Sequence, residues 1–227
     1  MVLPVNTTAR LKLLGVIDNM LETICEVMTD AYKRNWITSR DGNASIRHQD
    51  RDHFYVTPTG VRKQTLQPDQ FKKMGIRSTG YGLYATPLKY TDISSNLKPS
   101  GELPMHFGLQ QKINTEVRVI LHFHPTHTVA AMYAGIQLPT LLKEFPELSR
   151  YTSVAPNVPL LPPISQELAD SCIDALGYNK DTGDITYNIV GMDRHGVIAV
   201  DTSPWRAFEH IERLEHICQI VLTSGKY

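Results

Sequence analysis

The sequence lacks several features that would place it in a specialised class of protein. Its 227 residues include 3 cysteines, Cys25, Cys172 and Cys218, which are odd in number and far apart. Each lies in an apolar pattern typical of a helix, so we predict small buried side chains and no disulfide framework. No stretch approaches the roughly 20 apolar residues that a membrane-spanning helix needs. The amino end also has no basic segment followed by an apolar run, so we expect a cytoplasmic protein.

The chain has no excess of charge of either sign. Lys and Arg together number 23, as do Asp and Glu, and the basic residues are scattered along the sequence. This distribution excludes the electrostatic pattern of proteins that bind nucleic acid or anionic lipid, so we expect neither partner. The content of 41% hydrophobic and 20% charged residues is typical of a globular protein. A chain of this length can bury one substantial core, and we predict a single domain over residues 1–227.

Helix and strand patterns follow one another along the sequence. Apolar residues recur every three or four positions between Arg10 and Arg34, which predicts an amphipathic helix. Ser165 and the pair Ser203-Pro204 are typical of helix starts. The remaining predicted helices are 103–112, 125–134, 168–176 and 204–221, the predicted strands are 44–47, 54–56, 117–121, 185–190 and 197–200, and residues 72–100 are expected to form an edge hairpin or loop. This order predicts an α/β protein with helices packed on the faces of a mixed sheet.

Two histidines, His122 and His124, stand two residues apart at the end of the predicted strand 117–121. Because side chains alternate along a strand, both imidazoles project from the same face and can bind one cation. Zinc accepts neutral imidazole nitrogens, and a catalytic site keeps one position open for substrate. Such a pair also arises by composition in a chain with 9 histidines. His195, before another predicted strand, is the candidate third ligand, and His127 is a candidate for opening a helix or orienting a ligand.

Glu102 precedes the predicted helix 103–112, and two interpretations of it remain open. A carboxylate at a helix N-terminus is electrostatically favoured and often only caps the helix. Alternatively, it binds the cation and exchanges a proton with substrate, which requires a pKa tuned by the metal and by desolvation. Three turns of small residues could hold a phosphate through N–H and hydroxyl groups, although each is equally typical of a plain turn. These turns are residues 42–45, 57–60 and 99–101.

The order of these motifs resembles the class II aldolase/adducin family over residues 10–223 or so. The matching segments are residues 42–45, 57–60, 99–102, 122–124 and 194–196. The resemblance implies a three-layer α/β/α sandwich with a mixed, largely antiparallel central sheet. It also implies a homo-oligomer, a tetramer with active sites between subunits.

The family pattern, carried over residue by residue, implies a role for each matching position. His122, His124 and His195 become ligands of one Zn²⁺ ion per chain, with another divalent metal as the alternative. Glu102 becomes the catalytic carboxylate and is itself a metal ligand when substrate is absent. The positions that match the family's phosphate-binding residues are Asn43, Thr59, Gly60, Ser100 and Gly101. The implied reaction is the reversible cleavage of a ketose 1-phosphate to dihydroxyacetone phosphate and a short aldehyde through a metal-stabilised enediolate.

Two positions depart from the family pattern. Its aldolases use a tyrosine shortly after the proline that matches Pro139, and this chain has none there. The proton donor to the aldehyde oxygen therefore stays unassigned, with Lys143, Glu144 and Tyr151 as candidates. Gly101 also replaces the second serine of the usual phosphate-binding loop.

The same resemblance leaves other activities of the family open. Its sugar-phosphate 4-epimerases have Asp at the position of Glu102, so the glutamate favours an aldolase. Residues 36–38 and 60–63 resemble segments of its methylthioribulose-phosphate dehydratases, but those enzymes do not keep a carboxylate at the position of Glu102. A decarboxylase acting through the same enediolate is a further alternative. A non-catalytic, adducin-like interaction module is less favoured, because adducin heads lose the metal histidines. We expect a zinc-dependent aldolase that acts on a phosphorylated sugar.

Overall fold

One sheet of seven strands forms the centre of the molecule. The computed structural model describes residues 7–48, 52–79, 82–87 and 97–226, and it describes no side chains for residues 7–18 and 77–87. The strands lie in the order β4-β3-β2-β1-β5-β7-β6, and every neighbouring pair is antiparallel. Their bounds are β1 Asn43–His48, β2 His53–Val56, β3 Lys72–Thr79, β4 Gly82–Pro87, β5 Val117–Phe123, β6 Ile189–Met192 and β7 Gly196–Asp201.

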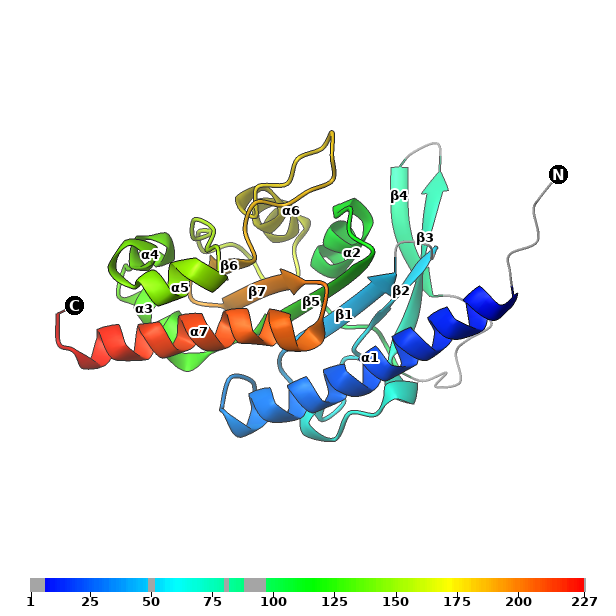
Figure 1. Ribbon diagram of the computed structural model, residues 1–227, viewed down its shortest axis with the longest axis horizontal. Helices are drawn as coiled ribbons and strands as arrows, with labels where there is room; N and C mark the ends of the chain where they lie inside the picture. Colours follow the sequence, from blue (N-terminus) through cyan, green and yellow to red (C-terminus); the bar gives the residue numbers. More distant parts are fainter. Residues whose placement is uncertain (1–6, 49–51, 80–81, 88–96, 227) are drawn as a thin grey trace.

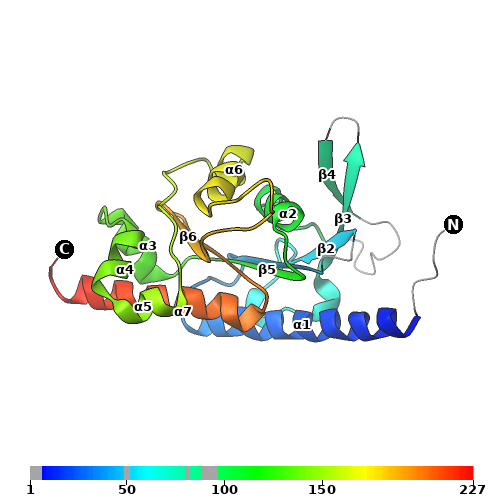
Figure 2. The same ribbon diagram turned by 45° about the horizontal axis from the view of Figure 1, so that its top comes forward.

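Helices cover both faces of this sheet and complete a three-layer α/β/α sandwich (Figures 1 and 2). The long helices α1 and α7 lie along one face, and α2 and α6 lie on the other. The α-helices are α1 Thr7–Lys33, α2 Leu103–Lys112, α3 Thr126–Tyr133, α4 Leu141–Glu144, α5 Pro146–Tyr151, α6 Gln166–Ala175 and α7 Pro204–Thr223. Short 3-10 turns are η1 Lys63–Thr65, η2 Pro68–Gln70 and η3 Leu138–Thr140.

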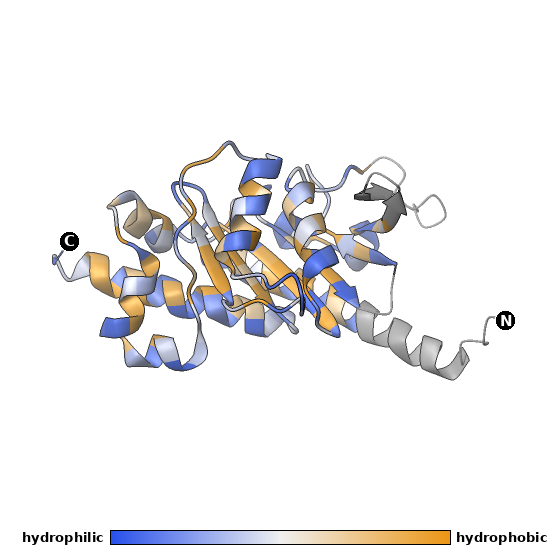
Figure 3. Ribbon diagram, turned by 90° about the horizontal axis from the view of Figure 1, so that it is seen from above, coloured by the Kyte–Doolittle hydropathy of each residue, from blue (hydrophilic) through white to orange (hydrophobic). Residues whose placement is uncertain are grey.

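Alternation along the central strands divides the core between the two faces. In β5, Val119, Leu121 and Phe123 belong to the cluster under α1 and α7, whereas Ile120 belongs to the cluster under α2 and α6. Each such buried side chain contributes about 1.5–3 kcal/mol relative to an exposed one. In Figure 3 the central strands are mostly hydrophobic, whereas the helices carry both hydrophilic and hydrophobic residues. His122 falls on the α2 side by the same alternation, so the sheet itself determines the face on which the site forms.

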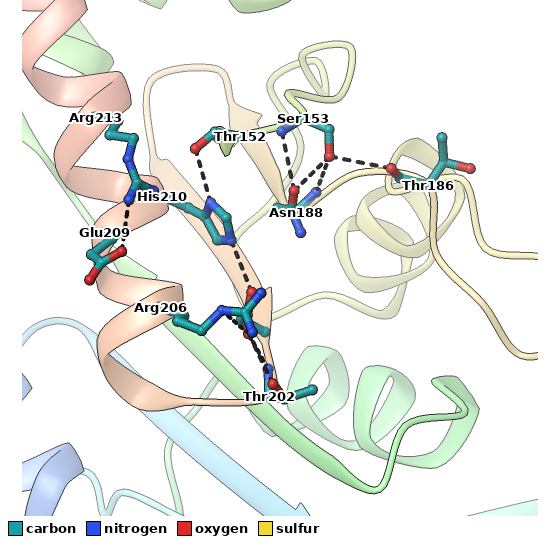
Figure 4. Close-up of polar contacts among 10 residues, drawn as sticks. Thr152, Ser153, Thr186, Asn188, Thr202, Arg206, Glu209, His210 and Arg213 are labelled. Carbon is teal, nitrogen blue, oxygen red and sulfur yellow. Dashed lines mark hydrogen bonds and ion pairs between the residues drawn. The ribbon is translucent and has the colours of Figure 1, made fainter. Parts of the chain in front are cut away.

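Buried polar contacts fasten α7 to the sheet (Figure 4). His210 on α7 bonds through Nε2 to Asp201 at the end of β7, 3.1 Å away, and through Nδ1 to the Thr152 hydroxyl, 3.0 Å away. Burial raises the pKa of Asp201, but the hydrogen bond from His210, with others, outweighs it and leaves that pKa below its usual value. Ser153 also exchanges hydrogen bonds with Asn188, just before β6. These contacts fix the orientation of the β6–β7 hairpin, which carries His195.

Most of the predicted elements are confirmed. Helix α2 has the predicted bounds, α1 contains the predicted helix except its last residue, and β3 and β4 form the expected hairpin at the sheet edge. The three cysteines are free, and Cys172 and Cys218 are buried while Cys25 is half-buried. The Leu11, Leu14 and Ile17 side chains, on which the first helix prediction partly rested, lie outside the described side chains. No described helix is both long and apolar enough to cross a bilayer.

Several local predictions were wrong or incomplete. Helices α4 and α5 were not predicted, and β6 begins at Ile189 and not at Ile185. The sheet contains no parallel pair among its described strands, and parallel pairing is limited to isolated bridges from Val154 and Val158 to β6. Ser203 does precede α7 as its N-cap residue, but its side chain makes no capping hydrogen bond. Pro204 lies within the first two helical positions, and its fixed φ favours the helix start without that bond.

The two serine caps allow a matched test of local stability. The Ser165 hydroxyl accepts a hydrogen bond from the Leu168 amide at 3.1 Å, so Ser165→Ala should lower the free energy of unfolding by about 1 kcal/mol. Ser203→Ala removes no such bond and should change it by less than about 0.5 kcal/mol. Urea denaturation measures both values, and equal losses would contradict the difference in capping.

Candidate metal centre

The pairing of β5 with β1 and β7 places the candidate residues at one edge of the sheet. Asn43, the first residue of β1, lies opposite His122, and His122 lies opposite Ile198 in β7. The chain reverses between β6 and β7 through residues 193–195, so His195 lies immediately before β7. His124 follows the last residue of β5. Segments from three distant parts of the sequence therefore meet where β5 ends.

The three imidazoles of His122, His124 and His195 form one cluster. One ring nitrogen from each lies within 4.8 Å of the others, which is close enough to hold a single metal ion. The Nδ1–H of His122 donates to the Val197 carbonyl at 3.0 Å, so its Nε2 lone pair faces the cluster. The Nε2 atom of His124 lies only 2.9 Å from Nε2 of His122. Two nitrogens held this close, with a third beside them, are the donor set that zinc accepts.

Burial keeps these imidazoles in the form that binds metal. Desolvation and the neighbouring histidines lower the pKa of His122 well below its usual value, and burial lowers that of His195. Burial together with His195 brings the pKa of His124 to about 4. All three rings are therefore neutral at neutral pH, and their lone pairs are available to a cation. The protein thus supports the predicted cluster both by geometry and by protonation state.

Gly196 permits the close approach of β7 to the imidazoles. A Cβ atom at this position would overlap the Phe123 carbonyl and would lie 2.7 Å from Cδ2 of His124. Arg194, with φ of 58°, makes the left-handed turn that brings the chain back into β7. Only glycine leaves room for both the strand pairing and the ring positions, so Gly196 is a structural requirement of the cluster.

Glu102 lies beside the cluster and does not act as a side-chain cap. It occupies the N-cap position of α2, but its carboxylate makes no capping hydrogen bond. Its Oε1 atom is 3.8 Å from Nε2 of His195. Burial raises the pKa of Glu102, and a hydrogen bond from the Ile164 backbone opposes that effect. A buried carboxylate at the edge of three imidazoles can exchange a proton with a substrate bound there.

A cavity of about 270 Å³ joins these groups. All three histidines, Glu102, Asn43, Thr59, Ser100 and Gly101 line it. Gly60, also expected to bind phosphate, is not among the lining residues. The amides of Thr59 and Ser100 are used within the protein, where they donate to Lys98 and Thr57 carbonyls at 2.9 and 3.0 Å. Side chains, more than these two amides, are therefore the donors that the cavity offers.

Other residues considered from sequence lie elsewhere. His127 opens α3, where its amide and Nδ1 bond to a Glu215 carboxylate oxygen at 2.9 and 2.8 Å. Lys143, Glu144 and Tyr151 lie on α4 and α5, and none of them lines the cavity. The proton donor to the aldehyde oxygen therefore stays unassigned in the described part of this chain.

His106 was missed at the sequence level. It follows Glu102 by four residues, so both lie on one side of α2, and it is fully buried. Its Nδ1 accepts a hydrogen bond from the Ser45 hydroxyl at 2.7 Å, and its Nε2–H donates to Oδ1 of Asn43. Burial lowers the pKa of His106 to about 3, so the ring stays neutral and fixes the orientation of the Asn43 amide. The helical spacing from Glu102 was the available signal.

The arrangement agrees with the family that the sequence matches. The model of the Class II Aldolase and Adducin N-terminal domain matches residues 22–222. The chain therefore belongs to the class II aldolase/adducin family.

Named relatives within this family are sugar-phosphate enzymes. The chain is 24% identical over 208 residues to the methylthioribulose-1-phosphate dehydratase of Komagataella phaffii, covering 88% of this chain and 80% of that protein. It is 24% identical over 226 residues to the enzyme of the same name from Talaromyces marneffei, covering 92% and 83%.

Solved structures share the fold. The sugar-phosphate aldolase of Thermotoga maritima superposes with a TM-score of 0.71 at 20% identity, covering 94% of this chain and 99% of the other. The L-fuculose-1-phosphate aldolase of Thermus thermophilus gives 0.68 at 19% identity, covering 90% and 93%. At these identities the likeness establishes the three-layer fold alone.

Substitution of Gly196 tests the metal centre. The wild-type protein should hold close to one zinc ion per chain, and Gly196→Ala should lose most of it because the new Cβ displaces His124. Gly135→Ala is the control, since a Cβ there has no atom within 4 Å although φ is 86°. It should cost stability and keep its metal. Elemental analysis after gel filtration measures both, and a full metal content in Gly196→Ala would contradict the arrangement.

Proposed function

We propose that this protein is a zinc-dependent lyase that dehydrates a ketose 1-phosphate. The observation that carries the proposal is the meeting of three neutral imidazoles and the buried carboxylate of Glu102 in one cavity. Membership of the family and the dehydratase names of the relatives support the substrate class and the reaction. Because of these relatives, dehydration replaces aldol cleavage as the preferred reaction. Zinc suits the imidazole donors, with another divalent metal as the alternative.

The cavity offers different groups for polarising the carbonyl and for moving the proton. When bound at the imidazoles, zinc supplies a Lewis acid that polarises the ketose carbonyl. The carboxylate of Glu102 then removes the proton from the carbon beside that carbonyl. The electrons of the broken C–H bond first form an enediolate of the substrate. They then form the new carbon–carbon double bond as the hydroxyl of the next carbon leaves with a proton, so the net change is the loss of one water. The raised pKa of Glu102 suits a group that must hold the abstracted proton.

Aldol cleavage is the second candidate, and Glu102 itself favours it. In that reaction the bond between the carbons breaks instead of the bond to the hydroxyl, and Glu102 gives a proton to the carbon left behind. Both reactions form an enediolate beside the same carboxylate. The family resemblance implies that its dehydratases keep no carboxylate at this position. This chain has one, because Oε1 of Glu102 lies 3.8 Å from Nε2 of His195, and cleavage is therefore a specific alternative. The proposal also includes a homotetramer, which rests on the family resemblance, and the cytoplasmic location expected from the sequence.

Product analysis separates the two reactions. The zinc-loaded protein should convert methylthioribulose 1-phosphate to a product lighter by one water, detected by mass spectrometry. It should form no dihydroxyacetone phosphate, which a coupled glycerol-3-phosphate dehydrogenase assay detects. Dihydroxyacetone phosphate without the dehydrated product would establish cleavage and reject dehydration. An isomeric ketose phosphate alone would indicate the epimerase reaction.

Glu102→Gln tests the proton transfer. The variant keeps the size of the side chain but removes the base, so kcat should fall by about 10²- to 10⁴-fold while the metal content is retained. In deuterated water the wild type should exchange the hydrogen on the carbon beside the carbonyl of the ketose 1-phosphate, and the variant should not. Glu147→Gln, an exposed glutamate on α5, is the matched control and should behave as the wild type. Undiminished exchange in Glu102→Gln would remove this residue from the mechanism.

A further inference from the structure

Lys63 places a buried positive charge in the wall of the cavity. The residue begins η1 and is 1% exposed, and it lines the same cavity as Glu102 and the histidines. Its Nζ atom donates to the Pro58 carbonyl at 2.8 Å and to the Val61 carbonyl at 3.2 Å. An ammonium group has three N–H donors, so one remains after these two bonds. Lys63 therefore offers the cavity a donor and a charge.

This charge has no anionic partner in the part of the chain that the structure describes. None of the ion pairs among the described residues includes Lys63. Asp41 is the carboxylate that acts on it electrostatically, but Asp41 is exposed and already accepts a hydrogen bond from the Thr38 hydroxyl. Arg40 opposes that effect. Lysines are almost never fully buried unless paired, so this arrangement indicates an anion that is supplied from outside the chain.

Neighbouring side chains of the cavity also offer donors. His106 fixes Oδ1 of Asn43 as an acceptor, and within the described residues no hydrogen bond takes up the Asn43 amide hydrogens. The Ser100 hydroxyl accepts from the Glu102 amide at 3.2 Å, so its own hydrogen is free to donate outward. Thr59 adds a second hydroxyl. A set of donors around one ammonium is suited to phosphate, whose oxygens accept charge-assisted hydrogen bonds.

We propose that Lys63 is the charge partner of the substrate's phosphate group and that His106 positions Asn43 as a second donor to it. The phosphomonoester lies between Lys63, Asn43, Thr59 and Ser100, while the imidazoles and Glu102 act on the carbonyl end. This assignment rests on the proposed function for the identity of the substrate. It adds two residues that the resemblance to the family did not assign.

Phosphate affinity tests the assignment without relying on catalysis. Inorganic phosphate is titrated into the zinc-loaded full-length protein by calorimetry. Lys63→Met and Lys63→Gln should weaken its binding about 10- to 100-fold, because a hydrogen bond to a charged group is lost. Arg62→Met removes the same charge from the exposed neighbouring residue, where solvent screens it, and should change affinity by less than about twofold. Metal content should be the same in all variants.

Several outcomes would overturn the role of Lys63. Unchanged phosphate affinity in both Lys63 variants would show that the ion binds at the metal or elsewhere, and equal weakening by Arg62→Met would show only a general charge effect. If neither Lys63 variant folds, a crystal structure of the metal-loaded wild type with dihydroxyacetone phosphate decides, since Nζ must lie within hydrogen-bond distance of a phosphate oxygen. Lys63-dependent phosphate binding without turnover of any ketose phosphate would refute the proposed function and leave this assignment intact.

The role of His106 has its own readout. Loss of the bond to Asn43 should weaken phosphate binding in His106→Asn, while kcat at saturating substrate changes much less than KM. Ser45→Ala removes the hydrogen bond to Nδ1 on the other side of the ring and should have a smaller effect of the same kind. A loss of kcat alone, with unchanged phosphate affinity, would contradict positioning of Asn43.

Discussion

The antiparallel pairing of β5 with β1 and β7 is the constraint on which the candidate site depends. It sets Asn43 beside His122 on one side and brings β7 alongside on the other, so that His195 reaches the pair from a separate hairpin. Gly196 is part of the same constraint, because any larger residue would separate the strand from the rings. The surrounding core fixes this register, since a shift by one residue would move His122 to the opposite face of the sheet.

Desolvation favours the neutral form of the ionisable groups at both ends of the cavity. At one end it keeps the imidazoles neutral and raises the pKa of Glu102, which favours a metal ion and proton transfer. At the other it lowers the pKa of Lys63 to about 8, since a buried ammonium is costly without an anion. A ligand with a phosphate at one end and oxygen ligands for a cation at the other satisfies both. The two ends of the cavity therefore differ chemically, and the proposed substrate, a phosphorylated ketose, carries the groups that both ends require.

The similar proteins differ in the reaction for which they are named. The relatives by sequence are named dehydratases, whereas the sugar-phosphate enzymes of known structure are named aldolases. In the proposed mechanisms both reactions need a cation that polarises the substrate carbonyl and a group that moves a proton at the neighbouring carbon, and the imidazoles and Glu102 of this cavity are the groups suited to these two tasks. The reactions differ in which bond to the next carbon breaks. That choice depends on the second proton-transferring group, and none of Lys143, Glu144 and Tyr151 lines the cavity in this chain.

Local patterns in the sequence determined the long elements and part of the site. Periodicity predicted most of α1, a serine hydroxyl predicted the start of α6, and alternation put His122 and His124 on one face. Tertiary structure alone decided the rest. The short helices α4 and α5 depend on packing more than on periodicity. The hydrogen bond between His106 and Asn43 joins residues that are 63 positions apart in the sequence. Lys63 resembles any polar turn residue until the fold buries it. The physical reason is that hydrogen-bonding period and caps are properties of neighbours in the chain, whereas register, desolvation and the meeting of distant side chains arise only when the whole sheet has formed.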